Sequence, residues 1–190
     1  KPPMSRILTG DVGSGKTVCA AAAIYTAVKN NMQAALMAPT EILARQHYDE
    51  LKPLFEKIGI KTALLTGSVR KAERVRINGE LACGAIDLII GTHALISPDI
   101  CFKKLGLVIT DEQHRFGVMQ RTALAEKSDI KIMNNSADQE ERKAAAHILV
   151  MSATPIPRTL AFTLYGDLAI SSLDELPPGR QNIDTFAVDS

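Results

Sequence analysis

The sequence predicts an α/β domain with a mostly parallel sheet and helices on both of its faces. Short apolar runs alternate with segments of helical pattern along the chain, as is typical of strand–helix repeats. Several runs, such as residues 88–90 and 107–109, are apolar at every position, which indicates strands that are buried on both faces. Residues 10–17 fit the pattern G-x-x-x-x-G-K-[ST] of phosphate-binding loops. Together these observations predict a P-loop nucleotide-binding domain.

Seven apolar segments are expected to form the strands of this sheet. They are residues 6–9, 33–38, 60–66, 86–90, 105–110, 147–151 and 168–173. An Ala-rich segment at residues 18–28 is apolar nearly all round, and we expect it to form a buried helix directly after the phosphate-binding loop. Residues 127–145 are interpreted as an insertion or flexible loop.

A second helix is expected over residues 41–58. Its apolar side chains follow the i, i+3, i+4, i+7 spacing of one helix face: Leu51, Leu54, Phe55 and Ile58. Gly59 provides a stop signal after them. Because Pro53 lies inside the segment, a kink or a break is expected there.

The phosphate-binding loop is the strongest functional signal in the chain. It consists of Gly10, Asp11, Val12, Gly13, Ser14, Gly15, Lys16 and Thr17. Its place between a strand and a helix directs backbone N–H groups and the positive end of the helix dipole at an anion. Its three glycines allow close backbone approach and positive φ. Lys16 is expected to bridge the β- and γ-phosphates of a nucleoside triphosphate, and the Thr17 hydroxyl to hold Mg²⁺.

Two acidic residues follow the apolar segment at 105–110. Ligands bind parallel sheets at the carboxyl ends of the strands, so Asp111 is placed to hold Mg²⁺ through water. Glu112 is the candidate general base that polarises the attacking water. The alternative for Glu112 is a solvated acid at a helix start, which the helix dipole also favours.

Composition narrows the classes of function. The 22 basic and 21 acidic residues nearly cancel, so no overall charge argues for nucleic acid or a membrane, and a site for a polyanion has to be local. The three cysteines, Cys19, Cys83 and Cys101, form no C-x-x-C pair. They predict reduced thiols, buried as small hydrophobic residues, in a cytoplasmic protein. No apolar run approaches 18 residues, so no membrane span is expected.

Five segments, in this order, resemble the superfamily 2 helicases and, more narrowly, the RecG family of bacterial branched-DNA helicases. They are GDVGSGKT (10–17), APTEILA (38–44), GTHAL (91–95), DEQHRFG (111–117) and MSATPIPRTL (151–160). LPPGR (176–180) matches that family's junction between two motor lobes. The resemblance implies a RecA-like P-loop NTPase fold for residues 1–175, with residues 176–190 as the linker and the truncated start of a second lobe.

The resemblance also implies the cofactors and the coupling residues. ATP with Mg²⁺ is the expected nucleotide, bound at Lys16, Thr17 and Asp111, with Glu112 as the base. Gln113 and His114 are expected to couple the nucleotide to the DNA side. Ser152 and Thr154 are expected to link hydrolysis to movement of the lobes.

The same resemblance implies that three loops line the face of the domain that contacts DNA. They are Pro39 and Thr40, then Thr66, Gly67 and Ser68, and then Gly91, Thr92 and His93. Hydroxyl and backbone N–H groups suit contacts with phosphates, which position DNA without reading its sequence. Taken alone, each loop is more typical of a plain turn. A basic stretch either contacts the DNA backbone or forms a solvated helix face: Arg70, Lys71, Arg74 and Arg76.

Three other functions are weighed against a RecG-like motor. The transcription-repair coupling factor shares HRFG and TPIPR but usually carries Glu at the position of Gln113. A GTPase-like switch would carry an Asn-Lys-x-Asp run, which the sequence lacks. An inert interaction scaffold would retain nucleotide merely to stay folded.

For the intact protein, the resemblance implies ATP-driven translocation on DNA and remodelling of branched DNA such as stalled forks and Holliday junctions. The expected partners are branched or duplex DNA, a second RecA-like lobe with an arginine finger, and a wedge domain, with no membrane partner. Because the sequence starts at Lys1 without an initiator Met, we expect the chain to be a piece of a longer protein. Because an arginine supplied in trans is worth roughly 10³–10⁵ in rate, the chain alone is expected to bind Mg-ATP weakly, to hydrolyse it very slowly and to unwind nothing.

Overall fold

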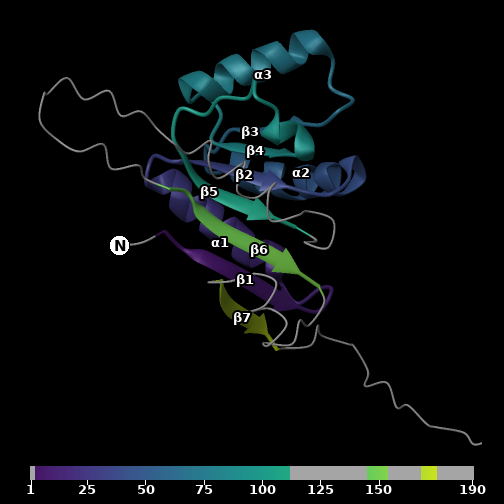
Figure 1. Ribbon diagram of the computed structural model, residues 1–190, viewed down its shortest axis with the longest axis vertical. Helices are drawn as coiled ribbons and strands as arrows, with labels where there is room; N and C mark the ends of the chain where they lie inside the picture. The colour runs from purple at the N-terminus through teal and green to yellow at the C-terminus, as the bar shows by residue number, and fades with distance from the viewer. Residues whose placement is uncertain (1–2, 112–144, 154–167, 175–190) are drawn as a thin grey trace, which may run out of the picture.

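The computed structural model describes residues 3–111, 145–153 and 168–174. In this part of the chain, seven strands form one parallel sheet in the order β3-β4-β2-β5-β6-β1-β7 (Figure 1). The strands are β1 (Ser5–Gly10), β2 (Gln33–Met37), β3 (Thr62–Leu65), β4 (Leu88–Gly91), β5 (Leu105–Thr110), β6 (His147–Ser152) and β7 (Ala169–Leu173). The helices are α1 (Lys16–Lys29), α2 (Glu41–Glu56), α3 (Lys71–Cys83) and the one-turn 3-10 helix η1 (His93–Ile96). The predicted α/β class with a parallel sheet is confirmed.

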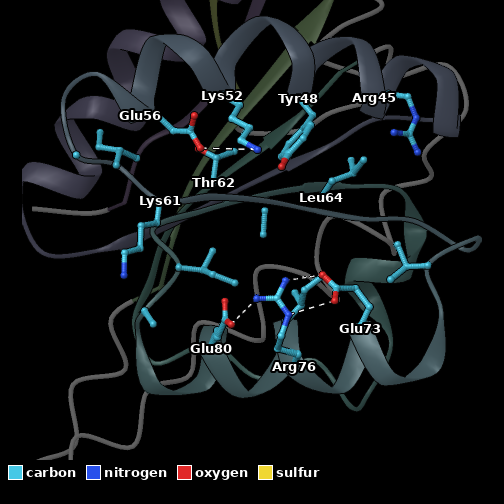
Figure 2. A pocket seen from close by; sticks show the side chains of 17 residues that line it. Arg45, Tyr48, Lys52, Glu56, Lys61, Thr62, Leu64, Glu73, Arg76 and Glu80 are labelled. Atoms are coloured by element: carbon cyan, nitrogen blue, oxygen red, sulfur yellow. Dashed lines mark hydrogen bonds and ion pairs between the residues drawn. The ribbon is translucent and has the colours of Figure 1, made fainter.

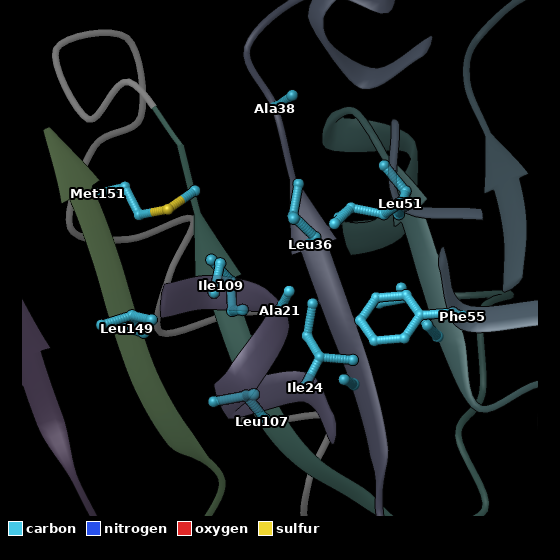
Figure 3. Packing of buried hydrophobic residues seen from close by; sticks show 14 of the residues in the cluster. Ala21, Ile24, Leu36, Ala38, Leu51, Phe55, Leu107, Ile109, Leu149 and Met151 are labelled. Carbon is cyan, nitrogen blue, oxygen red and sulfur yellow. The ribbon is translucent and has the colours of Figure 1, made fainter. Parts of the chain in front are cut away.

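Both faces of the sheet are buried by helices, as the continuous apolar runs predict. On β2, Ala34 and Leu36 belong to a core cluster with residues of α1 and α2, and Figure 3 shows Leu36 near Ile24 and Phe55 in that cluster. The alternate residues of β2, Ala35 and Met37, belong to a second cluster that includes residues of α3. Successive side chains of a strand point to opposite faces, so the two clusters lie on the two sides of the sheet.

The first predicted helix buries one face only. Ala20, Ala21 and Ile24 of α1 are buried, whereas Val18 is 72% exposed and Tyr25 is 42% exposed. The prediction that this segment is buried nearly all round is therefore wrong. A helix that packs on one side of a sheet buries a single stripe, and the remaining apolar residues of α1 lie outside that stripe.

Helix α2 runs through Pro53 without a break, so a break at this residue is ruled out. Pro53 itself is exposed, and the helix carbonyl that it leaves without an N–H partner can be hydrated there. Of the predicted apolar face, Leu51 and Phe55 are buried, while Leu54 and Ile58 are 53% and 46% exposed. Their exposure means that only part of the predicted stripe packs against the sheet.

The three cysteines are free thiols. Cys83 and Cys101 are exposed, so the prediction that all three are buried as small hydrophobic residues is wrong for these two. Among the described residues, no helix combines the length and the apolar character needed to cross a membrane. Residues 127–144 and 176–190 lie outside the described part of the chain, and the expectations for them stay predictions.

The packing of α2 yields a stability prediction. Phe55→Ala is expected to lower the free energy of unfolding by about 3–5 kcal/mol, because it removes a large side chain from a close-packed core, where Phe55 is 1% exposed. The neighbouring Leu54→Ala, at an exposed position, is expected to change it by no more than about 0.5 kcal/mol. Urea denaturation of both variants measures the difference, and equal losses would contradict the observed orientation of α2.

Candidate functional site

The predicted site residues that the structure describes lie at or directly after the carboxyl ends of strands. All seven strands are parallel, so these ends share one edge of the sheet. The ends of β3, β4 and β2 are neighbours and carry the residues expected to contact DNA. The ends of β5 and β1 carry those expected to hold the nucleotide, and the end of β6 between them carries Ser152, which is expected to link hydrolysis to lobe movement. The edge therefore has a β3-β4-β2 half and a β5-β6-β1 half.

The phosphate-binding loop follows β1, and its glycines have different structural roles. Gly13 and Gly15 have φ values of 83° and 93°, in the left-handed region that residues with a Cβ rarely adopt. At Gly10 the constraint is space, because a Cβ would lie 2.5 Å from Oγ of Ser14 and 3.0 Å from the Cβ of Leu173. The loop is thus built for close backbone approach, as the motif predicts.

The N-terminal end of α1 is suited to an anion. Gly15 is its N-cap, no side chain of the described residues caps the helix, and the first turn holds no acidic residue. The first N–H groups of a helix have no partner within it, and they lie at the positive end of the helix dipole. A phosphate group at this end would satisfy those donors.

Lys16 places its charge at the same loop. Its Nζ donates to the backbone carbonyls of Gly10 and Asp11, each at 2.7 Å. These contacts use two of the three donors of an ammonium group and hold it beside the turn of the loop. Lys16 thus lies where the motif requires a cation for the phosphates.

Asp111 follows β5 and is nearly buried, at 9% exposure. Its backbone N–H donates to the carbonyl of Met37 at 2.9 Å, and its Oδ2 lies 2.6 Å from Nε2 of His47. Only β6 separates β5 from β1 in the sheet, a distance of about 10 Å at the usual strand spacing. Folding therefore brings this carboxylate to the same edge as the phosphate-binding loop.

The oxygen donors of this edge fit a magnesium ion that arrives with a nucleotide. The described residues contain no group of three or more His, Cys, Asp or Glu that could hold a metal ion by itself. Mg²⁺ at nucleotide sites usually takes one or two protein oxygens together with phosphate oxygens and waters. Thr17, at the start of α1, and Asp111 supply oxygens of that kind.

His47 is a site residue that the sequence reasoning missed. It lies in α2 and is 8% exposed, and the other buried residues of this helix are Ala44, Leu51 and Phe55. A polar residue on an otherwise apolar stripe is the signal that could have identified it, since burial of an imidazole is costly without a partner.

Several predicted residues are outside the described part of the chain: Glu112, Gln113, His114 and Thr154. Ser152, expected to link hydrolysis to lobe movement, is the last residue of β6 and is 1% exposed. It pairs with Thr9 of β1 in the sheet register, so it lies next to the strand that leads into the phosphate-binding loop.

The structure brings two of the three expected DNA loops together. Thr40 is the N-cap of α2, and its Oγ1 accepts a hydrogen bond from the N–H of Leu43 at 3.3 Å. In the first turn of α2, Oε1 of Glu41 accepts a hydrogen bond from the N–H of Ser68 at 3.0 Å. The loop at residues 66–68 is therefore tied to the start of α2.

Burial divides the expected DNA contacts into two groups. Thr66 and Thr92 are 1% and 2% exposed, so their hydroxyls are not presented to a phosphate backbone in this conformation. Gly67, Ser68 and His93 are exposed at the same edge. The hydroxyl of Thr66 instead lies 3.0 Å from that of Ser68.

Gly91, the last residue of β4, has a structural reason to be glycine. A Cβ at this position would lie 2.1 Å from the carbonyl oxygen of Leu65 and 3.1 Å from a methyl group of Leu95. The neighbouring strand and η1 leave no room for a side chain. The role of Gly91 in DNA binding stays a prediction.

Two of the four residues in the basic stretch are paired with neighbouring acids. Arg74 donates to both carboxylate oxygens of Asp99, at 2.9 and 3.0 Å, and these bonds, with one from Ser97, hold the pKa of Asp99 well below its usual range. Arg76 is paired with Glu73 and Glu80 on α3, and its pKa is raised by them. For Arg74 and Arg76 this favours the solvated helix face over a DNA contact.

A groove of about 880 Å³ lies beside the edge strand β3, between α2 and α3 (Figure 2). Its walls carry ion pairs, such as that of Lys52 with Glu56, whose charged atoms are 3.7 Å apart. None of the residues predicted to bind the nucleotide or magnesium, or to form the three DNA loops, lines it, although Arg76 of the basic stretch does. Four strands lie between β3 and β1, which separates the groove from the phosphate-binding loop by about 24 Å, so the groove is not the nucleotide site.

The chain is similar to known helicases in both sequence and structure. A sequence model of the DEAD/DEAH box helicase family matches residues 4–162. The ATP-dependent DNA helicases RecG of Synechocystis and Bacillus subtilis are 50% and 51% identical to the chain over 98% and 97% of its length. A solved structure of RecG bound to a three-way DNA junction has a TM-score of 0.74 and 45% identity over 95% of the chain. The chain spans 21% and 25% of these two curated relatives and 22% of the solved chain.

The lysine of the loop gives a binding prediction. Lys16→Ala is expected to weaken ATP binding by about 10–100-fold, the effect of losing one or two hydrogen bonds to a charged group. The matched control is Lys29→Ala, which removes a lysine from the last turn of the same helix and is expected to leave the affinity unchanged. A fluorescence titration with labelled ATP measures both, and unchanged affinity in the Lys16 variant would contradict the phosphate-binding assignment.

The close approach at Gly91 gives a second prediction. Gly91→Ala is expected to lower the free energy of unfolding by about 1–3 kcal/mol, because the added methyl group overpacks the contact with β3. Gly79→Ala is the control, since a Cβ there meets nothing within 4 Å and removal of a helical glycine is expected to stabilise by about 0.5–1 kcal/mol. A Gly91 variant of normal stability would show that the constraint from β3 is absent.

Proposed function

The chain belongs to the DEAD/DEAH box helicase family, and we propose that residues 1–175 form the first RecA-like motor lobe of an ATP-dependent DNA helicase of the RecG type. Residues 176–190 are then the linker and the start of a second lobe. The relatives reported above favour this assignment over a lobe of a transcription-repair coupling factor, because those relatives are RecG helicases.

One observation carries the proposal. The phosphate-binding loop, Asp111 and the loops expected to contact DNA lie at one edge of one sheet, in two adjoining halves. A motor that couples hydrolysis to movement on DNA needs a site for each ligand, with conformational changes that link the two. A nucleotide-binding scaffold would need only the β5-β6-β1 half.

The residues of the β5-β6-β1 half bind different parts of Mg-ATP. Lys16 and the N-terminal end of α1 bind the phosphates, and Thr17 and Asp111 hold the magnesium ion of Mg-ATP. When bound, that ion neutralises charge that develops on the β- and γ-phosphates. Glu112, next to Asp111 in the chain, accepts the proton of the attacking water.

The residues of the β3-β4-β2 half position DNA. Gly67, the hydroxyl of Ser68 and the imidazole of His93 are exposed towards its phosphates, and the first turn of α2, with Pro39 and Thr40, adjoins them. Contacts of this kind fix the register of DNA without reading its sequence. Branched DNA, such as stalled forks and Holliday junctions, is the substrate we propose for the whole protein, with a wedge domain recognising the branch.

The second lobe completes the ATP site. We propose that it supplies an arginine finger, a contribution worth roughly 10³–10⁵ in rate in related phosphoryl-transfer sites. The 190-residue chain alone is then expected to bind Mg-ATP and to hydrolyse it very slowly, whether or not DNA is present. We propose that the whole protein acts in the cytoplasm.

The test compares two proteins, the chain and the longer helicase in which we propose it lies. Adding three-way junction DNA is expected to stimulate ATP hydrolysis by the longer protein and not by the chain. In the longer protein, Glu112→Gln is expected to lower the stimulated rate by about 10²–10⁴-fold, the usual contribution of a general base, with ATP affinity retained. Brisk, DNA-stimulated turnover by the chain alone would show that its active site is complete, and an unaffected Glu112 variant would remove that residue as the base.

A further inference from the structure

A buried imidazole–carboxylate contact joins α2 to the end of β5. Nε2 of His47 lies 2.6 Å from Oδ2 of Asp111, and the two residues are 8% and 9% exposed. They are 64 positions apart in the sequence. A short contact between two polar groups out of water is strong and directional, so each side chain restricts the orientation of the other.

The geometry assigns a direction to this hydrogen bond. An ionised carboxylate can only accept, so Nε2 of His47 carries the proton and donates it. Nδ1 of the same ring is buried and has no hydrogen-bond partner among the described residues.

The contact also spans the two halves of the sheet edge. Strands β2 and β5 are neighbours, and α2 begins directly after β2, with its N-cap at Thr40. His47 lies seven residues along α2 from that cap, about 10 Å at 1.5 Å per residue. The helix that starts in the β3-β4-β2 half therefore reaches the candidate metal ligand of the β5-β6-β1 half.

We propose that His47 is a positioning residue for the magnesium site: it holds one carboxylate oxygen of Asp111 and so fixes the direction in which the carboxylate meets Mg-ATP. This inference rests on the proposed function, since it gives His47 a role only if Asp111 serves a bound nucleotide. Residues that hydrogen-bond to metal ligands commonly contribute 10–100-fold to metal affinity or activity. His47 itself touches neither phosphate nor metal.

The test uses the full 190-residue chain and measures ATP affinity with magnesium and with EDTA. In the wild-type chain, magnesium is expected to tighten ATP binding. His47→Leu is expected to reduce that gain by about tenfold or more, with the affinity in EDTA unchanged because the phosphate-binding loop is intact. His47→Gln is expected to restore most of the gain, since its Nε2 amide is a donor the same number of bonds from the backbone.

Phe55→Leu is the matched control for stability. Phe55 is a buried residue on the same helix, and its truncation loosens the packing of α2 without removing the donor to Asp111. It is expected to lower the melting temperature and to leave the magnesium-dependent gain unchanged. A loss of the gain in Phe55→Leu equal to that in His47→Leu would show that general loosening of α2 is the cause, and the proposal would be overturned.

A spectroscopic measurement on the wild-type chain does not depend on whether a variant folds. In ¹⁵N-histidine NMR, His47 is expected to carry a proton on Nε2, and its resonances are expected to move on addition of Mg-ADP more than on addition of ADP in EDTA. Equal shifts under the two conditions, or a full magnesium gain in a folded His47→Leu variant, would overturn the proposal. A wild-type chain that binds no nucleotide would instead contradict the proposed function.

Discussion

The parallel direction of all seven strands is the constraint from which the site follows. Parallel strands end at one edge, so the loop after each strand reaches the same surface, however far apart the segments lie in the sequence. The order of the strands then decides which loops are neighbours. Strands β6 and β5 lie between β1 and β2 although they come later in the chain. The loops after β2, β3 and β4 are thereby grouped apart from the phosphate-binding loop, with the end of β5 at the boundary.

Helix α2 links these two groups through polar contacts at separate turns. Its first turn holds the loop after β3 through Glu41 and Ser68, and its middle holds the end of β5 through His47 and Asp111. Between and beyond these contacts the helix packs by apolar residues such as Leu51 and Phe55. Apolar packing fixes where the helix lies, while the buried polar contact restricts the orientation of one carboxylate, because hydrogen bonds depend on direction and hydrophobic burial does not.

Residues of the motif-bearing loops also serve the fold itself. Thr40 caps a helix, and Gly91 leaves room for the carbonyl of Leu65. Thr66 and Thr92 place their hydroxyls in the interior. Small residues and hydroxyl residues are suited to caps, turns and close strand approach for the same physical reasons that suit them to phosphate contacts. A loop motif of this kind therefore indicates a functional edge more reliably than it identifies the atoms that touch a ligand.

The sequence by itself determined the elements that depend on near neighbours. Apolar runs located the strands, the glycine pattern located the phosphate-binding loop, and the acid after residues 105–110 located Asp111, since each signal lies within a few residues of chain. Tertiary structure alone decided the strand order, the exposure of Leu54, the pairing of Arg74 with Asp99, and the contact of His47 with Asp111. These contacts join segments far apart in the chain, or depend on which side of a helix meets the sheet. Local pattern carries no information on either, because both are set by how the sheet is ordered and packed.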